Sequence, residues 1–472
     1  MAAFSAFMQR VTFAFGLIGS FAVVSGAHAN DITAQWPGWN EVSPEVFPDE
    51  TWLRYEAPED AGWSADGLAA AAAYAQEHGS SAGFVLYDGA VLTEWGETER
   101  RFKCHSVRKS LMSALFGMAV AEGSINLDES LAEIGIDDDT PLTDMEKSAK
   151  VSDLLKARSG VYLPAAYETR SMKRGRPERG SHAPGTHWYY NNWDFNALGA
   201  IYNLKTGRDL FGDFEARLAR PLGMQDFDLS HTYYHLEAQN SRFPAYPFRM
   251  SARDLARFGL LFLNEGKWSD QQIIPASWVA ESTRSYSARK RGGGYGYMWW
   301  TFGRKLGEMG TYAALGYGGQ AVIVVPAARL VYVNRVNTYD RHRMSTKAIA
   351  DTLVQILKAR TGPPKADPKL VPVPELDRSH ASVTLTADER ARLTGAYRSD
   401  LINARVTDDG DGLAISDPNQ GTFHLVPQGP TSFLIEGFQR EAQFVENGAG
   451  EITGLKIAKA KDGWSLVPRV GD

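Results

Sequence analysis

Cysteine is almost absent from this sequence: its 472 residues include one, Cys104. A single cysteine excludes an internal disulfide and any metal site built from several thiolates. Because Cys104 lies far from the N-terminus, it is also not a lipid-carrying residue beside a cleaved leader. We assign Cys104 no catalytic role, and we predict neither a bound metal nor a cofactor.

The sequence also lacks an excess of basic residues and, beyond its N-terminus, any long apolar run. Its 50 Lys and Arg against 56 Asp and Glu give a formal net charge of −6, so no nucleic-acid partner is indicated. No later segment is long and apolar enough to predict a membrane span. The composition, 43% hydrophobic and 22% charged, predicts one large globular domain with a smaller one.

The N-terminus has the pattern of a secretion signal. Arg10 precedes the apolar run 11–24, which is short for a membrane span, and Ala27-His28-Ala29 is a small-x-small cleavage sequence. The polar stretch that follows carries no stop-transfer charges, which argues against an uncleaved anchor. We expect residues 1–29 to be a signal peptide cleaved after Ala29. The mature chain is then periplasmic or secreted, with no stable membrane span.

Residues 30–360 alternate between helical and strand patterns and form the larger predicted domain. Residues 64–79 have a polar start and a glycine stop and predict a helix, and residues 83–96 predict two strands joined at Asp88-Gly89. Helices and loops dominate from Ser106 to about Ser285, including an amphipathic helix in "RMSARDLARFGLLFLNEGKW". Strands return in "GYGYMWWTF" and "AVIVVPAARLVYVNRVN", where Pro326 marks a turn.

The composition changes after Arg360. Residues 361–382 are proline-rich without periodicity and predict a linker. Residues 383–472 contain short strands separated by turn residues, which favours a small antiparallel barrel or sandwich. Within it, Asp408–Gly412 resembles a calcium loop, but the glutamate that ends such a loop is missing, so a hairpin turn is the better interpretation.

The stretch "CHSVRKSLMSALFGMAV" contains a serine and a lysine three residues apart, Ser106 and Lys109. On a helix these two side chains share a face, and the helix start offers amide hydrogens to a developing oxyanion. The apolar residues that follow predict a helix buried all round, which would lower the pKa of the lysine and let its neutral amine take a proton from the serine.

Simpler interpretations of these residues remain open at this point. Ser106 could be an ordinary N-cap while Lys109 extends to water. A second Ser-x-x-Lys, Ser287 to Lys290, lies in a basic loop with no apolar helix after it, so chance matches occur. The Gly-x-Ser-x-Gly sequence at 79–83 follows a predicted helix and precedes a strand, the reverse of a nucleophile elbow, and we interpret it as a turn.

Two further motifs make a family resemblance specific. "PGTHWYYNNWDFNALGAIYN" has a Pro-Gly turn, aromatic residues and asparagines before an apolar helix, and "LGYGGQAVIVVP" has a glycine run that enters a strand. With "SVRK", the sequences "YNN" and "YGG" reproduce in order the Ser-x-x-Lys, Tyr-x-Asn and Lys- or His-x-Gly motifs. The chain resembles the serine β-lactamase and penicillin-binding-protein-like hydrolases, above all the class C β-lactamase and esterase branch, over about residues 59–360.

The resemblance implies an α+β fold, with an antiparallel sheet flanked by helices and a helical subdomain. It also implies roles for individual residues. Ser106 would be the nucleophile, and Lys109 and Tyr190 would share its proton. Tyr189-Tyr190-Asn191 also fits the second motif, but the family's spacing from the Pro-Gly selects Tyr190 and Asn192, with Asn192 orienting the lysine and the substrate. In the third motif, Tyr317, Gly318 and Gly319 would line the substrate site.

The amides of Ser106 and Gln320 would then form the oxyanion hole. Tyr317 stands where many relatives have a lysine or histidine that helps to hold the substrate carboxylate, which puts efficient penicillin or D-alanyl-D-alanine recognition in doubt. We therefore expect an esterase or amidase acting on a small-molecule ester, amide or peptide. The alternatives are a β-lactamase or D-alanyl carboxypeptidase, and a non-catalytic penicillin-recognising receptor in which the β domain binds.

Overall fold

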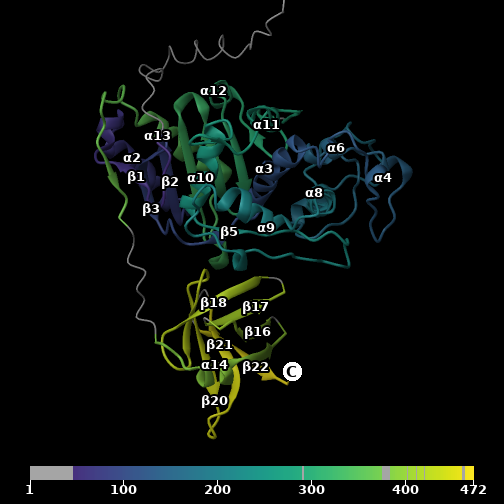
Figure 1. Cartoon of the computed structure of the whole chain (residues 1–472), viewed down its shortest axis with the longest axis vertical. Coiled ribbons are helices and arrows are strands. Elements are labelled where there is room, and N and C mark those ends of the chain that lie inside the picture. Colours follow the sequence, from purple (N-terminus) through teal and green to yellow (C-terminus); the bar gives the residue numbers. More distant parts are fainter. Residues whose placement is uncertain are drawn as a thin grey trace, which may run out of the picture.

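The computed structural model describes residues 46–289, 292–374, 383–400, 402–410, 412–418, 420–459 and 463–471. The predicted signal peptide, Lys290 of the second Ser-x-x-Lys and residues 375–382 of the predicted linker lie outside the described residues. The described chain forms a large sheet with helices against both faces, a helical region beside it and a separate closed barrel (Figure 1). This is the predicted α+β architecture.

The large sheet has ten strands in the order β14-β1-β3-β2-β13-β12-β11-β10-β9-β8. Neighbouring strands are antiparallel except β1 and β3, which are parallel. The strands are β1 (Leu53–Tyr55), β2 (Ala82–Tyr87), β3 (Ala90–Gly96), β8 (Ser287–Ala288), β9 (Gly294–Tyr295), β10 (Trp300–Thr301), β11 (Tyr312–Gly316), β12 (Gln320–Val325), β13 (Leu330–Arg335) and β14 (Leu370–Pro372).

Both faces of the central strands are buried, because alternate side chains enter two different cores. Phe84 and Leu86 of β2 belong to one core, and Val85 and Tyr87 belong to the other. Helices α2 (Ala65–Glu77) and α13 (Thr346–Lys358) cover one face, while α3 (Val107–Ala121) and α10 (Ala252–Leu263) lie on the other. The predicted helix at 64–79, the hairpin at Asp88-Gly89 and the amphipathic helix are confirmed.

The helical region lies beyond α3 at the right of Figure 1. Its longest helix, α8, contacts α3 and so brings this region against the helix that follows Ser106. The elements are α4 (Leu131–Ile134), α5 (Asp144–Lys147), α6 (Val151–Leu155), α7 (Arg170–Gly175), α8 (Asn192–Thr206), α9 (Leu210–Phe214), η2 (Glu215–Ala219) and η3 (Leu229–His231). The shorter helices α11 (Ala276–Ser282) and α12 (Arg304–Glu308) lie above the sheet in the same view.

The C-terminal part is a closed antiparallel barrel, one of the two architectures that its sequence predicts. Its eight strands close in chain order, from β15 to β22. They are β15 (Gly395–Arg398), β16 (Asn403–Asp408), β17 (Leu413–Asp417), β18 (Gly421–Pro427), β19 (Ser432–Ile435), β20 (Arg440–Glu446), β21 (Ile452–Ala458) and β22 (Trp464–Val470), preceded by helix α14 (Ala387–Leu393). Asp408, which begins the segment compared with a calcium loop, and Leu413, which follows it, pair across β16 and β17, as a hairpin requires, while Asp411 within it lies outside the described residues.

Part of the predicted linker belongs to the large sheet. Strand β14 pairs with β1, with Arg54 opposite Val371. The prolines around this strand argued against it in the sequence. An edge strand tolerates proline, because the backbone groups on its outer side need no partner strand. The chain therefore leaves the large sheet after Pro372, later than the composition suggested.

The barrel contacts the large domain at one end (Figure 1). Arg249 of β5 (Arg249–Met250) donates to the backbone carbonyls of Gln420 and Thr422, the latter at 2.6 Å. Arg440 of the barrel donates to the carbonyl of Tyr339 and pairs with Asp340. Strand β5 pairs with β4 (Phe102–Lys103), which leads directly to Ser106, so this barrel end lies close to the strand that precedes Ser106. Across the described residues, no helix is long and apolar enough to cross a bilayer.

Candidate active site

Ser106 stands at the N-terminus of α3, where it is partly exposed while the helix behind it is enclosed. Its side chain makes no capping hydrogen bond to the helix, which differs from the ordinary N-cap interpretation. Every residue from Val107 to Ala119 is buried, because the helix packs between the sheet and the helical region. The apolar sequence therefore fixes a rigid helix with an accessible hydroxyl at its positive end.

Lys109 connects the elements of the site. Its Nζ lies 3.0 Å from Ser106 Oγ, 2.7 Å from the Tyr190 hydroxyl and 2.9 Å from Asn192 Oδ1. The side chain is 1% exposed, and it has no carboxylate partner among the residues that the structure describes. A protonated lysine can donate to all three oxygens. A neutral amine has two N–H groups and one lone pair, so one hydroxyl must then donate to the nitrogen.

Burial lowers the pKa of Lys109 well below its usual value, and the neighbouring Arg108 guanidinium lowers it further. The rings of Tyr190 and Phe195 lie 4.2 and 4.4 Å from Nζ and favour the charged form. We give more weight to burial, because these contacts are weak compared with the desolvation of a charge that has no counterion. The lowered pKa therefore favours a neutral Lys109 amine beside the serine hydroxyl.

Tyr190 lies in an aromatic wall of the site. Burial raises the pKa of its hydroxyl to about 12, against the opposing influence of Ser106 and Arg108, so the phenol is neutral at physiological pH. Its ring lies within 6 Å of those of Phe195, Tyr295 and Trp300. Trp300 therefore belongs to this wall, whereas the adjacent Trp299 is fully buried against Phe258. These tilted and edge-to-face ring contacts fix the direction of the hydroxyl.

The two candidate registers of the Tyr-x-Asn motif have different surroundings. Asn192, at the start of α8, donates from Nδ2 to the carbonyl of Tyr167 at 2.7 Å, which turns its oxygen toward Lys109. Asn191 instead caps α8 and donates to the carbonyl of Val161. The Tyr189 hydroxyl donates to the carbonyl of Met172, in α7. The structure therefore brings Tyr190 and Asn192 to Lys109 and directs Tyr189 and Asn191 elsewhere.

The residues of the third motif form the turn between β11 and β12. Gly318 and Gly319 have φ values of +83° and +109°, which favour glycine. Gln320 is fully buried, and its side chain bonds to the backbone of Val336, away from Lys109. Tyr317 is 44% exposed, and its ring lies 5.4 Å from that of His105. Tyr317 is thus the member of this motif whose ring contacts the residue before Ser106.

Gly316, at the end of β11, approaches that segment most closely. A Cβ added to it would lie 2.5 Å from the carbonyl oxygen of Cys104. Strand β10 pairs with Tyr312 and Ala313 of β11, and in the described chain that pairing does not extend to Gly316. At Gly316 the β10 side of β11 therefore has no strand partner among the described residues. No motif in the sequence marks this glycine as part of the site, although its position before "YGG" is a usable signal.

Two residues at the site adopt strained backbone conformations that the sequence does not indicate. His105 has φ +49° directly before Ser106, and Tyr167 has φ +70° where its carbonyl receives Asn192. Non-glycine residues in this region are uncommon and cluster at functional sites. His105 bonds through Nε2 to the Thr338 hydroxyl, and burial and the cations around it lower its pKa to about 3, so it is neutral.

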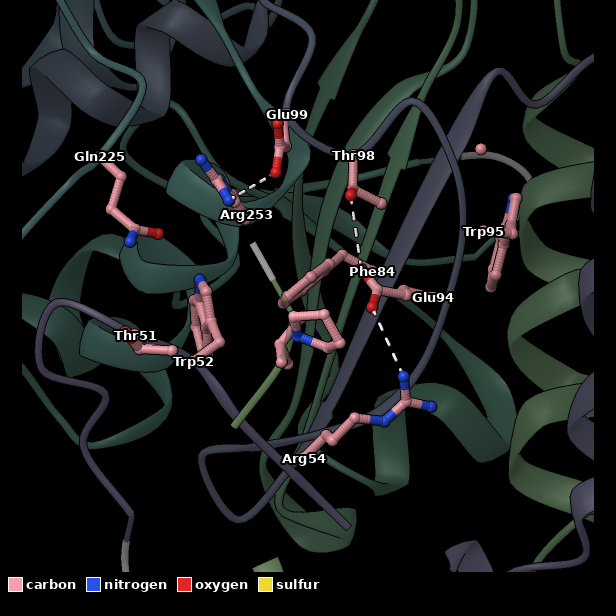
Figure 2. Close-up of a pocket in the computed structure, with 13 residues that line it drawn as sticks. Thr51, Trp52, Arg54, Phe84, Glu94, Trp95, Thr98, Glu99, Gln225 and Arg253 are labelled. Atoms are coloured by element: carbon pink, nitrogen blue, oxygen red, sulfur yellow. Dashed lines mark hydrogen bonds and ion pairs between the residues drawn. The ribbon is translucent and has the colours of Figure 1, made fainter. Parts of the chain in front are cut away.

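A cavity of about 380 Å³ lies elsewhere, beside β1 and β3 (Figure 2). Trp52 and Phe84 form part of its wall, and its charged groups pair with one another: Arg54 with Glu94, and Arg253 with Glu99. None of the candidate catalytic residues lines it. Among the described residues, no group of three or more His, Cys, Asp and Glu side chains could hold a metal ion. The hydroxyl–amine–phenol cluster is therefore the better candidate for chemistry.

Comparisons with known proteins agree with this architecture. The sequence model described as Beta-lactamase matches residues 65–356, from α2 into α13, and includes all the candidate site residues. An uncharacterised protein of Alkalihalophilus pseudofirmus is 21% identical over 298 residues, which cover 54% of this chain and 83% of that protein.

Solved structures resemble the chain at lower identity. The octameric penicillin-binding protein homologue from Pyrococcus abyssi is 16% identical, with a TM-score of 0.46, over 85% of this chain and 99% of that one. EstCE1, described as a hydrolase with promiscuous acyltransferase activity, is 15% identical, with a TM-score of 0.46, over 65% of this chain and 99% of its own.

Proposed function

The chain belongs to the beta-lactamase family and is a serine hydrolase, and from this premise we propose that it cleaves an ester or amide through an acyl-enzyme on Ser106. The observation that carries the proposal is the position of Lys109, whose buried Nζ lies within 3.0 Å of both Ser106 Oγ and the Tyr190 hydroxyl. A neutral amine beside a serine hydroxyl is the arrangement that nucleophilic catalysis needs.

Acylation begins with transfer of the Ser106 proton to the neutral amine of Lys109 as Oγ attacks the carbonyl carbon. The proton then passes to the Tyr190 hydroxyl, whose own proton goes to the leaving group, and the scissile C–O or C–N bond breaks. Tyr190 relays the proton because its pKa of about 12 keeps the phenol protonated at rest. The two groups interact directly, so they titrate as a coupled pair.

Deacylation reverses the roles of these groups. A water molecule gives a proton to the Lys109–Tyr190 pair and attacks the acyl carbon, the ester bond to Ser106 breaks, and Oγ regains a proton from the pair. Asn192 holds Lys109 in position during both steps, because its amide is itself fixed by the carbonyl of Tyr167.

We assign the oxyanion hole to the backbone amides of Ser106 and Tyr317, in place of the expected Gln320. Two observations support Tyr317: Gly316 lies close to the Cys104 carbonyl, and at Gly316 the β10 side of β11 has no strand partner among the described residues. Gln320, by contrast, begins β12, the next strand toward the centre of the sheet, and its side chain is buried. Preorganised amides of this kind stabilise the tetrahedral intermediate by about 3–4 kcal/mol each.

Esters and amides without a carboxylate beside the scissile bond fit the site better than penicillins. Tyr317 occupies the position expected for a cation, and the aromatic residues around Tyr190 offer an apolar wall. We therefore rank esterase or amidase activity above β-lactamase or D-alanyl carboxypeptidase activity, and both above a non-catalytic receptor. We further propose that the chain is exported, on the basis of its first 29 residues.

The test compares a chromogenic short-chain ester with a chromogenic cephalosporin on the mature chain and on Ser106→Ala. We expect turnover of the ester that requires Ser106 and slower cephalosporin hydrolysis. Faster cephalosporin turnover would favour the β-lactamase alternative, and adduct formation without turnover would favour the receptor.

A further inference from the structure

The C-terminal barrel is filled at one end and hollow at the other. At the filled end, Phe444 packs against both Phe433 and Tyr397. The hollow end contains a cavity of about 330 Å³, a volume typical of small-molecule sites. An eight-stranded barrel is just wide enough to hold one small ligand in this way. Its apolar wall consists mainly of Ile402, Ile415, Phe423, Ile435, Phe438 and Ile457.

The polar groups of the cavity lie at the end that faces the large domain. Arg440 already pairs with Asp340 and with the carbonyl of Tyr339. Asp417 accepts from the amide of Asn403, and Gln420 Oε1 accepts from Lys103 of the large domain at 3.4 Å. The cavity therefore has aliphatic and aromatic walls inside the barrel and a polar mouth at the junction of the two domains.

Two cations of the large domain contact residues that line the cavity, Lys103 through Gln420 and Arg249 through Phe423. Lys103 and Arg249 are directly opposite each other on the β4–β5 pair, an arrangement of like charges that costs stability. The Arg249 guanidinium lies 3.7 Å from the ring centroid of Phe423, a residue of the cavity wall. Both side chains are buried, at 8% and 1% exposed.

Lys103 has no carboxylate partner within ion-pair distance among the described residues. Its amine contacts Gln420 through a weak hydrogen bond and faces the rings of Tyr167 and Tyr233, at 5.2 and 5.6 Å. Burial, together with Arg249 and Arg108, lowers the pKa of its amine to about 7, while Asp417 opposes this shift. An anion at the mouth would supply the missing counterion and restore the charged form.

We propose that the barrel binds a medium-chain aliphatic carboxylate, with its tail in the cavity and its head group at Lys103. The tail is matched by walls that offer mostly hydrocarbon, and the head by a buried amine without a counterion. A cationic head group would face both Lys103 and Arg249 and is disfavoured. The site is separate from Ser106, and the proposal does not depend on the reaction there.

The binding test uses the mature full-length chain with Ser106→Ala, so that no probe can be turned over. Decanoate, decanol and decyltrimethylammonium are titrated calorimetrically. We expect saturable binding of decanoate, weaker binding of decanol and the weakest binding of decyltrimethylammonium. Absence of saturable decanoate binding would overturn the proposal, as would tighter binding of the cationic probe.

Matched variants locate the tail. Ala404→Phe fills the cavity from a buried position on β16, and Ile457→Phe fills it from a half-buried one, while Leu466→Phe adds the same ring on the barrel exterior. Each filling variant is first checked for an intact fold by circular dichroism. We expect either one to lower the affinity for decanoate at least tenfold, and Leu466→Phe to leave that affinity unchanged. Equal affinities in all three would place the ligand outside the barrel and contradict the proposal.

A second pair of variants tests the head group. Lys103→Met should lower the affinity for decanoate at least tenfold and leave the affinity for decanol unchanged. Lys347→Met, at an exposed position of α13, should change neither affinity. If Lys103→Met weakens both probes equally, or neither, the assignment of the carboxylate to Lys103 is wrong.

Discussion

Among single residues, Lys109 matters most, because the proposed acylation requires its amine to be neutral. Lys109 is enclosed by Ser106, Tyr190 and Asn192, which are all neutral groups. A buried ammonium without a carboxylate loses more hydration than three hydrogen bonds return, so the amine is neutral at a pH where free lysine is charged. On this property rests the proposal that Lys109, three residues after Ser106, acts as the base.

The pH dependence of acylation tests that charge state. Because the base must be unprotonated, kcat/KM should fall as the pH is lowered through the depressed pKa of Lys109, and Lys109→Met should lower it by about 10²–10⁴-fold. The measurement is a pH profile of ester hydrolysis by the wild-type chain and Lys109→Met. A base acting as an ordinary exposed lysine would instead give activity that rises only near pH 10.

Tyr190 and Tyr189 provide an internal comparison, since they are adjacent and both carry a bonded hydroxyl. Tyr190→Phe removes the proton relay and should lower kcat by about 10²–10⁴-fold with little loss of thermal stability. Tyr189→Phe removes only a bond to the Met172 carbonyl and should leave kcat nearly unchanged. Steady-state ester hydrolysis by the two variants decides the register, and the opposite ranking would select Tyr189.

At the scale of elements, strand β11 and helix α3 must meet closely for the oxyanion hole to form. Gly316→Ala would bring a methyl group 2.5 Å from the Cys104 carbonyl, and the resulting shift should move the Tyr317 amide away from the intermediate. We expect a loss of kcat of about 10²-fold or more. Gly362→Ala is the control, because its added methyl group meets nothing within 4 Å.

Both variants would be assayed for kcat and for melting temperature. A Gly316→Ala enzyme with normal kcat would show that this close approach has no part in catalysis. If the melting temperature falls so far that the variant is partly unfolded at the assay temperature, and this accounts for the lost activity, the glycine has a purely structural role.

Most elements could be predicted from the sequence, because their signals are local. Ser64 and the alanine-rich run after it specify α2, and Asp88-Gly89 specifies the β2–β3 hairpin. Strand β14 could not be predicted, since it depends on pairing with the distant β1. The closeness of Gly316 to Cys104 and the strained backbones of His105 and Tyr167 likewise arise from contacts between distant segments, which no local pattern records.

At the scale of the whole molecule, the barrel buries a cation of the large domain at the junction. Lys103 has a pKa of about 7 when folded and about 10.4 when unfolded. Between these values the unfolded chain binds the extra proton, so this group makes the free energy of unfolding rise with pH. Below about pH 7 the cost of desolvating the charge beside Arg249 and Arg108 is fully present, with Asp417 partly offsetting it.

Replacing Lys103 should therefore stabilise the chain more in acid than in base. The melting temperature of Lys103→Met should exceed that of the wild type by a larger margin at pH 6 than at pH 9, as measured by calorimetry. Lys347→Met, at an exposed site, should show no such difference between the two pH values. An equal difference in melting temperature between Lys103→Met and the wild type at both pH values would mean that the Lys103 amine of the wild type stays charged across this range.

Intact-protein mass measurement during pre-steady-state ester hydrolysis is the decisive experiment for the proposed acyl-enzyme on Ser106. We expect a burst of released alcohol and an added mass equal to the acyl group, both present in the wild-type chain and absent from Ser106→Ala. Ester hydrolysis that proceeds at the same rate in Ser106→Ala, or an adduct that persists in that variant, would contradict it.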